Sequence, residues 1–71
     1  MMFNLSLREA IIQRVQDKDE EELLEIIEGS MHGDEHALPG LGVLFEIIWD
    51  HIDTSLRSQL VSQLKKHLPS T

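Results

Sequence analysis

The sequence predicts an all-α fold: a compact bundle of four short helices around one central apolar helix. The first observation is a dense apolar run at residues 38–49, LPGLGVLFEIIW, which holds two of the three aromatic residues. Wound as a helix from Leu41 to Ile52, this run carries apolar side chains around roughly 240° of its circumference. The flanking segments repeat apolar residues at helical spacing, and no segment alternates as a strand does. A helix this apolar needs cover from the other helices.

Length and composition describe a single helical domain spanning residues 1–71. A chain of 71 residues buries only about 60% of the surface that it exposes when unfolded, so its packing must be efficient. It contains no cysteine, which excludes disulfides and thiolate metal sites. Met1 is followed by no basic segment with an apolar core, so we expect no signal peptide. About a dozen apolar residues cannot span a membrane, and we expect no membrane partner.

Charge is distributed unevenly along the chain. The net charge is −7, and between Asp17 and Glu35 nine acidic residues stand against Lys18 alone. From Thr54 to Thr71 there are three basic residues and no acidic one. The overall field repels nucleic acid and anionic lipid, so we expect no nucleic-acid partner. The basic segment can still contact an acidic protein or the acidic helix of its own chain.

Two capping signatures mark the starts of the first two helices. Ser6 is followed three residues later by Glu9, and Asp19 by Glu22, a spacing that satisfies free amides of a first helical turn. The first helix therefore starts near Leu7, and the pattern ends at 16–18. In the second helix, the glutamates lie opposite the leucine and isoleucine face, which indicates a solvated acidic surface.

Glycine and proline predict the connection between the second and third helices. We expect the second helix to end near His32, with Gly33 in the left-handed conformation that follows a helix. Residues 34–37 fit one irregular helical turn. Pro39 and Gly40 then suit a type II turn. The candidate structural turn thus comprises Pro39, Gly40 and Gly42.

The third helix is expected to run to about His51 and the fourth to begin after a cap at Asp53. Leucines at helical spacing form a stripe on the fourth helix that ends before Pro69: Leu56, Leu60, Leu64 and Leu68. Tight connections make a bundle in which the first, second and fourth helices surround the third the economical arrangement.

The residues that might carry chemistry form no complete motif. His32 and His36 would share a helix face with Asp34 or Glu35, but Gly33 interrupts the helix, so solvent-exposed histidines are favoured over a metal site. The spacing of the glycines near Pro39 matches neither the dinucleotide-binding motif nor the P-loop, the two glycine-rich motifs that bind phosphate. No nucleophile lies in a recognisable setting. We predict no enzyme activity, no cofactor and no metal site.

His51 and His67 lie at the ends of the third and fourth helices, where we expect them to cap.

Two arginines lie within otherwise apolar arcs. Arg8 and Arg57 would cover the core edge with their stems while their charges reach water. Alternatively, they pair with Glu46 or Asp50, the polar strip of the third helix.

The third helix also suggests an interface. Phe45 and Trp49 are expected to lie largely buried in the core. Val43 and Ile47 project from the opposite side, where we expect three short partner helices to leave them uncovered, and they form the candidate protein interface. A weak twofold homodimer would bury this patch. A closed monomer, in which the second or fourth helix wraps further round, stays open as the alternative.

The run at 38–49 resembles the most recognisable stretch of the small acid-soluble spore protein I family. Further positions agree in register without a gap: Leu7, Arg8, Ala10, Ile12, Val15, Leu23 and Gly33. Ser6 departs from the family's usual Asn, and the charges of the second and fourth helices also differ.

The resemblance implies a minor spore protein, produced in the forespore during sporulation and resident in the spore core. It brings no catalytic or binding residues. A non-enzymatic structural or interaction role is the favoured reading. The alternative is a nucleic-acid-associated spore protein that contacts DNA through its basic C-terminal helix.

Overall fold

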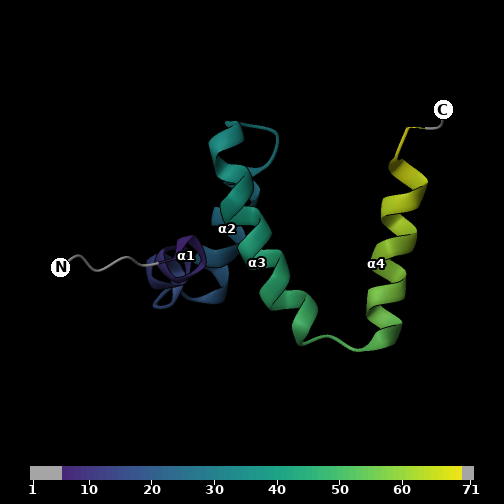
Figure 1. Ribbon diagram of the computed structural model, residues 1–71, viewed down its shortest axis with the longest axis horizontal. Helices are drawn as coiled ribbons and strands as arrows, with labels where there is room; N and C mark the ends of the chain where they lie inside the picture. The colour runs from purple at the N-terminus through teal and green to yellow at the C-terminus, as the bar shows by residue number, and fades with distance from the viewer. Residues whose placement is uncertain (1–5, 70–71) are drawn as a thin grey trace.

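The chain forms helices joined by short turns, and no strand, within residues 6–69, the part that the computed structural model describes (Figure 1). It has four α-helices and one short 3-10 helix in this range: α1 (Leu7–Val15), α2 (Glu20–Ser30), η1 (Glu35–Ala37), α3 (Leu38–Asp50) and α4 (Thr54–His67). The predicted all-α class is therefore confirmed. None of these helices is both long and apolar enough to cross a membrane.

The predicted starts of the first, second and fourth helices are confirmed in atomic detail, whereas α3 begins at Leu38, earlier than the predicted turn allowed. The Ser6 Oγ accepts from the Glu9 amide at 3.1 Å, and the Glu9 carboxylate accepts from the Ser6 amide at 3.0 Å. Asp19 and Glu22 make the same reciprocal pair at the start of α2, at 2.8 and 3.0 Å. Asp53 accepts from the Leu56 amide at 2.8 Å. Each cap satisfies an amide that has no partner within its helix.

The connection after α2 differs from the prediction. α2 ends at Ser30, whose hydroxyl donates to the Ile26 carbonyl at 2.8 Å. The residue with a left-handed backbone is His32, with φ of 59°, whereas no described glycine has positive φ. Gly33 is therefore not the conformational stop that we expected, because His32 makes the reversal one residue earlier. Asp34 then caps η1 by accepting from the His36 amide at 2.9 Å.

The type II turn predicted at Pro39 and Gly40 is wrong. Both residues lie in the first turn of α3. Proline suits that place because its missing N–H would have no helical partner there. The chain has already turned at His32, so helix geometry needs nothing special from Gly40. An added Cβ at Gly40 or Gly42 would meet no atom within 4 Å, so a close backbone contact at this point is not present either.

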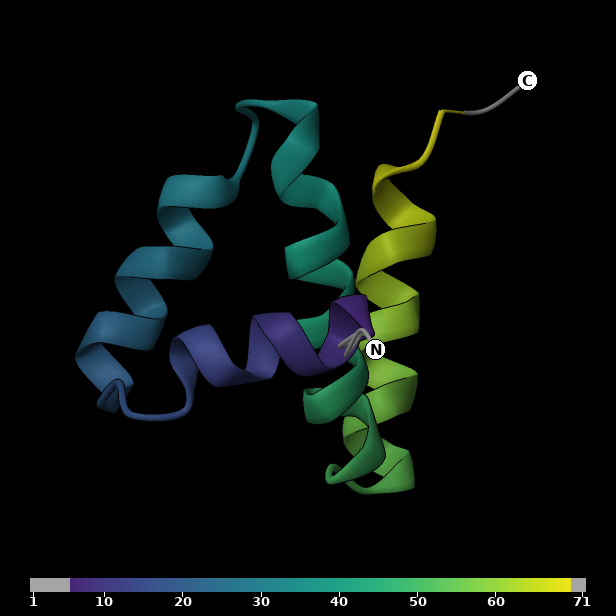
Figure 2. The same cartoon turned by 60° about the vertical axis from the view of Figure 1, so that its left-hand side comes forward.

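Three helices pack together and the fourth stands apart. α1 and α2 both contact α3, and η1 leads directly into it. Figure 1 shows α4 returning from the end of α3 as a separate arm, and Figure 2 shows α1 crossing α3. The Cα radius of gyration is 14.6 Å, whereas about 11 Å is typical of a compact chain of this length. The compact four-helix bundle is therefore not formed by the single chain.

Burial is correspondingly low. Within residues 6–69 one side chain, Val43, is buried, with 7% of its surface exposed. Phe45 is 50% exposed and Trp49 is half-buried. The predicted burial of Phe45 and the predicted exposure of Val43 are both wrong. The reason is that α1 crosses α3 on the side of Val43 and Glu46, which are neighbours one helical turn apart.

Candidate functional site

The most prominent surface of the described chain is apolar and lies in two places. The first is an open groove of about 300 Å³ between α1, α2 and α3, which we call the interhelix groove. Its apolar lining consists of Ile12, Val15, Leu23, Ile27, Leu44, Ile47 and Ile48. Ile47 and Ile48 remain 41% and 45% exposed. Branched aliphatic side chains from three helices thus meet without closing over one another.

The second apolar surface is the α4 stripe, which consists of Leu56, Leu60, Val61, Leu64 and Leu68. Four of these five side chains are exposed, and Leu60 is half-buried. Leu64 is the most open at 58%. The sequence pattern that predicted a core-facing stripe is present on the helix, but most of the stripe stays exposed within residues 6–69.

Of the two candidate interface residues, the structure leaves one exposed. Ile47 lines the interhelix groove, whereas Val43 is buried on the α1 side of α3 and is not available to a partner. Ile48 also lines the groove, and Leu24 and Met31 are exposed as well; none of the three was predicted as part of an interface. Their helical spacing matched a core face equally well, so the sequence held no signal that could separate the two.

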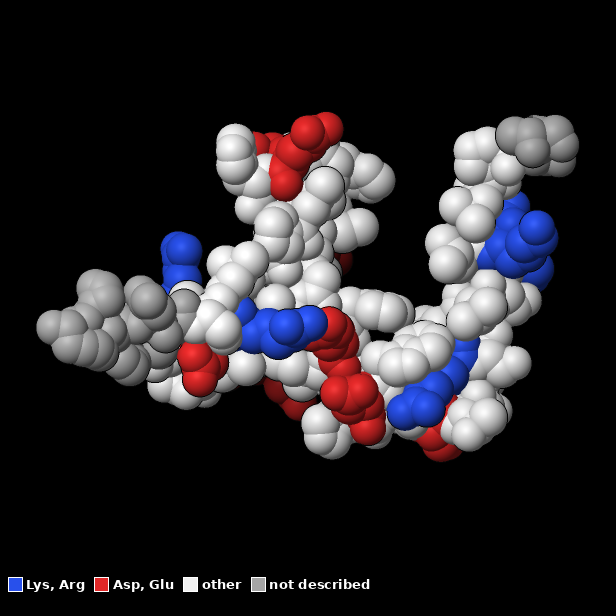
Figure 3. All heavy atoms as spheres, in the orientation of Figure 1, with Lys and Arg blue, Asp and Glu red and all other residues white. Residues whose placement is uncertain are grey.

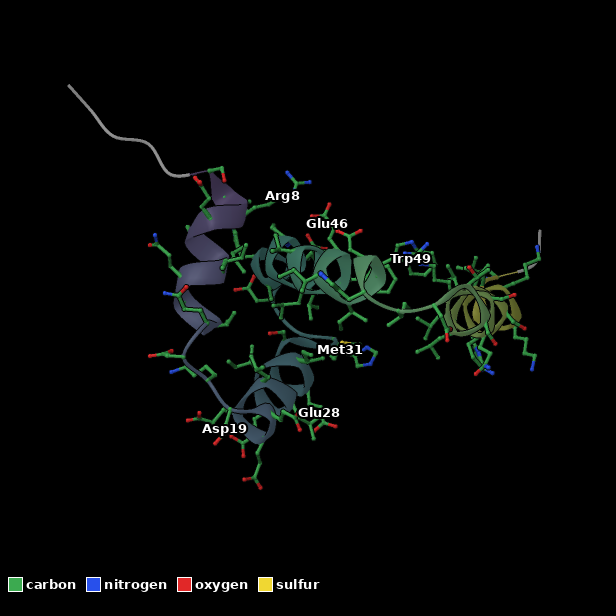
Figure 4. All side chains as sticks on the ribbon, turned by 90° about the horizontal axis from the view of Figure 1, so that it is seen from below. Arg8, Asp19, Glu28, Met31, Glu46 and Trp49 are labelled. Carbon is green, nitrogen blue, oxygen red and sulfur yellow. The ribbon has the colours of Figure 1, made fainter. Side chains whose placement is uncertain are left out.

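An arginine–carboxylate pair fastens α1 to α3. Arg8 Nε donates to one carboxylate oxygen of Glu46 at 2.7 Å, and Arg8 Nη2 donates to the other at 2.8 Å. Figure 4 shows the two side chains pointing toward one another. Hydrogen bonding from Arg8 lowers the pKa of Glu46, and the same bond raises the pKa of Arg8. This is the pairing that the sequence analysis left open for Arg8.

Arg57 makes a different contact, at the junction of α3 and α4. Its Nε and Nη2 both donate to the Trp49 carbonyl, at 3.0 and 2.8 Å. Its guanidinium also lies 5.5 Å from the centre of the Trp49 ring, a cation–π distance. The carbonyl is one of those that the end of α3 leaves without a helical partner. Arg57 therefore pairs with neither Glu46 nor Asp50, and it fixes the start of α4 instead.

The histidines serve local structure. His51 and His67 each place Nδ1 2.8 Å from the carbonyl four residues earlier, as their predicted capping role requires. His36 Nδ1 lies 2.8 Å from Asp34, and the His36 amide bond to that carboxylate is the main cause that lowers the pKa of Asp34. His32 is exposed in the turn. Across residues 6–69, no three metal-binding side chains come together.

A larger depression of about 610 Å³ lies at the start of α3. Arg14, Lys18 and His36 line it together with Pro39 and Gly40. Pro39 and Gly40 thus border this open depression, whereas Gly42 lines a separate one beside Arg8 and Glu46.

Charge separates the α4 arm from the other helices. Figure 3 shows Lys and Arg along α4, whereas most of the acidic side chains in that view lie over the unit formed by α1 to α3. The first turn of α2 holds three consecutive glutamates, and the last turn of α4 holds Lys65, Lys66 and His67. The last turn of α4 is thus basic and the first turn of α2 acidic, although Lys18 also lines the interhelix groove.

Comparison with known proteins identifies the relatives. Residues 5–68 match the family model described as small, acid-soluble spore protein I. A protein of that name from Shouchella clausii is 41% identical over 69 residues, 96% of this chain and 97% of its own. The protein of that name from Bacillus subtilis is 40% identical over 63 residues, covering 87% and 89%. No solved structure matches the chain. The chain therefore belongs to the small acid-soluble spore protein I family, and this membership gives it a spore-associated role.

Proposed function

We propose that the chain is a non-enzymatic interaction protein of the spore core, which binds a protein surface through the interhelix groove and the α4 stripe. Family membership supplies the association with spores. The placement in the core, the absence of catalysis and the interaction role are the proposal. The observation that carries it is the exposure of two apolar surfaces by a chain that buries one side chain within residues 6–69.

Exposed apolar surface of this extent indicates binding. Isolated apolar residues on a surface need no explanation, but contiguous patches mark sites of interaction. The interhelix groove brings six isoleucine and leucine side chains and one valine into one depression. The α4 stripe adds a row of leucines at i, i+4 spacing. Such rows are what an amphipathic helix offers when it docks into an apolar groove.

The polar side chains support a structural reading over a catalytic one. Arg8 and Glu46 join two helices, Arg57 binds a helix-end carbonyl, and three histidines contact carbonyl or carboxylate groups beside them. None of these groups is buried, and burial is what usually shifts a pKa toward catalytic use.

Photo-crosslinking in sporulating cells tests the proposal. A photoreactive amino acid at Leu64, on the α4 stripe, should give crosslinked protein adducts in the spore-core fraction. The matched control places it at Ser62, on the opposite side of the same helix, and should give few. Equal yields at the two positions, or recovery of the chain outside the spore core, would contradict the proposal.

A further inference from the structure

We propose that a second copy of the chain is the partner, with the α4 stripe of each copy lying in the interhelix groove of the other. This inference rests on the proposed interaction function and names its occupant. Each chain carries both an apolar ridge and an apolar groove, so two copies related by a twofold axis satisfy both surfaces at once. Such self-complementary pairing is the commonest form of oligomer.

The groove accepts part of the α4 stripe. Its lining takes Leu23 and Ile27 from α2 and residues 44–48 from α3, about one turn of each helix. Two successive leucines of the stripe, such as Leu60 and Leu64, are also one turn apart on α4. One helix can pack in this way against two others.

Charge orients the pairing. Glu28 on α2 is one turn from Leu24, an exposed leucine of the same helix. Figure 4 shows Met31 and Glu28 on the side of α2 that faces α4. Lys65 lies one turn from Val61 on the α4 stripe. Docking a partner's stripe with Lys65 toward α2 pairs that lysine with Glu28, whereas Lys18, which also lines the groove, disfavours a second lysine beside it.

The chain's own α4 is held away from its own groove. Residues 51–53 join α3 to α4. Arg57, in the first turn of α4, binds the Trp49 carbonyl through two donors and lies over the Trp49 ring. This clamp sets the open angle that Figure 1 shows between α3 and α4. The α4 of a partner is tied by this contact to its own α3 and not to the α3 that borders this groove.

The described chain leaves apolar surface for a dimer to cover. Within residues 6–69, twelve large apolar side chains are exposed, whereas one apolar side chain, Val43, is buried. A standard interface buries about 800 Å² on each partner, so pairing two copies would cover part of this apolar surface.

Sedimentation equilibrium of the full chain is the first test. The wild type is expected at twice its 8.2 kDa mass at high micromolar concentration. Ile47→Glu in the groove and Leu64→Glu on the stripe should each raise the dimer Kd at least about 100-fold, because each buries a charge against apolar surface. Ser62→Glu adds the same charge on the opposite side of α4 and should leave the Kd within about threefold. Circular dichroism verifies that each variant keeps its helices.

Charge reversal separates pairing between chains from closure within one chain. Lys65→Glu and Glu28→Lys should each weaken the homodimer about tenfold or more. Mixing the two variants should restore a one-to-one heterodimer, because both interfaces then pair opposite charges. Closure within one chain predicts no heterodimer on mixing.

A wild type that stays monomeric at millimolar concentration would overturn the inference, as would a dimer that Ile47→Glu and Leu64→Glu leave intact. If Leu64 then still crosslinks to another protein in spores, the proposed interaction function stands without the second copy. If Leu64 gives no more adducts than Ser62, that function fails as well.

Discussion

The α1–α3 unit and the α4 arm begin in the same way and end differently. Asp19 and Asp53 cap α2 and α4 with identical 2.8 Å bonds to the third amide. α2 then packs on α3, whereas α4 keeps most of its apolar stripe exposed. Local signals determine where each helix starts, but only contact with other elements determines whether its apolar face becomes buried.

The comparison also bears on stability. Isolated helices shorter than about 12–15 residues are marginal in water, and α4 has 14 residues. The α1–α3 unit gains stability from Val43 and from the Arg8–Glu46 pair, whereas Arg57 anchors only the first turn of α4. In the single chain, α4 should therefore open at lower free energy than α1 to α3.

The largest difference in the free energy of unfolding should come from a valine-to-alanine substitution made once in the α1–α3 unit and once in α4. Val43→Ala removes two methyl groups from the buried position and should reduce the free energy of unfolding by about 2 kcal/mol. Val61→Ala, on the exposed stripe, should change it by less than about 0.5 kcal/mol, since alanine favours helix more than valine. Urea unfolding of monomeric protein measures both. Equal losses would mean that α4 is packed as tightly as α3.

Removing the helix caps should show the same difference in stability between the α1–α3 unit and α4. Asp19→Ala should lower the global stability of the α1–α3 unit by about 1 kcal/mol. Asp53→Ala should cost α4 a similar amount, but as local fraying without a shift in the main unfolding transition. Near-ultraviolet circular dichroism of Trp49 and amide exchange in α4 distinguish the two responses. A main transition shifted equally by both variants would contradict this account.

Acid should loosen the α1–α3 junction by a small amount. Arg8 lowers the pKa of Glu46 in the folded chain, so the pair stabilises the fold above the ordinary glutamate pKa, about 4.3. That contribution is lost as the pH falls through the lowered folded pKa. Glu46→Gln should therefore melt below the wild type at pH 7 and match it in strong acid. A difference that persists unchanged at low pH would exclude the ion pair as its cause.

How far the sequence predicts this molecule depends on the range of each interaction. Ser6, Asp19 and Asp53 act on amides within three residues, so their caps follow from spacing alone. The burial of Val43 does not, because α3 is apolar around most of its circumference and nothing local says which arc α1 will cover. For the same reason, the sequence could not predict that Phe45 is exposed. Arg8 lies in an otherwise apolar arc of its helix, and Glu46 and Asp50 form the polar strip of α3, so the sequence offered either carboxylate as a partner for Arg8. Only the packing of α1 on α3 determines that the partner is Glu46.

The smallest effect expected is on DNA. Arg57 already contacts Trp49, which leaves Lys65 and Lys66 as the basic pair near the end of α4. Two phosphate contacts give little affinity and a shallow salt slope. We expect no shift of duplex DNA at micromolar protein and physiological salt. A clear shift with a steep salt dependence would favour the alternative that α4 contacts nucleic acid.

The most direct test of the account is amide hydrogen exchange measured across a range of protein concentrations. Dimerisation through α4 predicts that protection in α4 rises steeply with concentration, and that α1 to α3 gain less because they already pack within one chain. Leu64→Glu should abolish the rise, and Ser62→Glu should keep it. Strong protection of α4 that is the same at every concentration would show that the chain closes on itself, and would contradict the account.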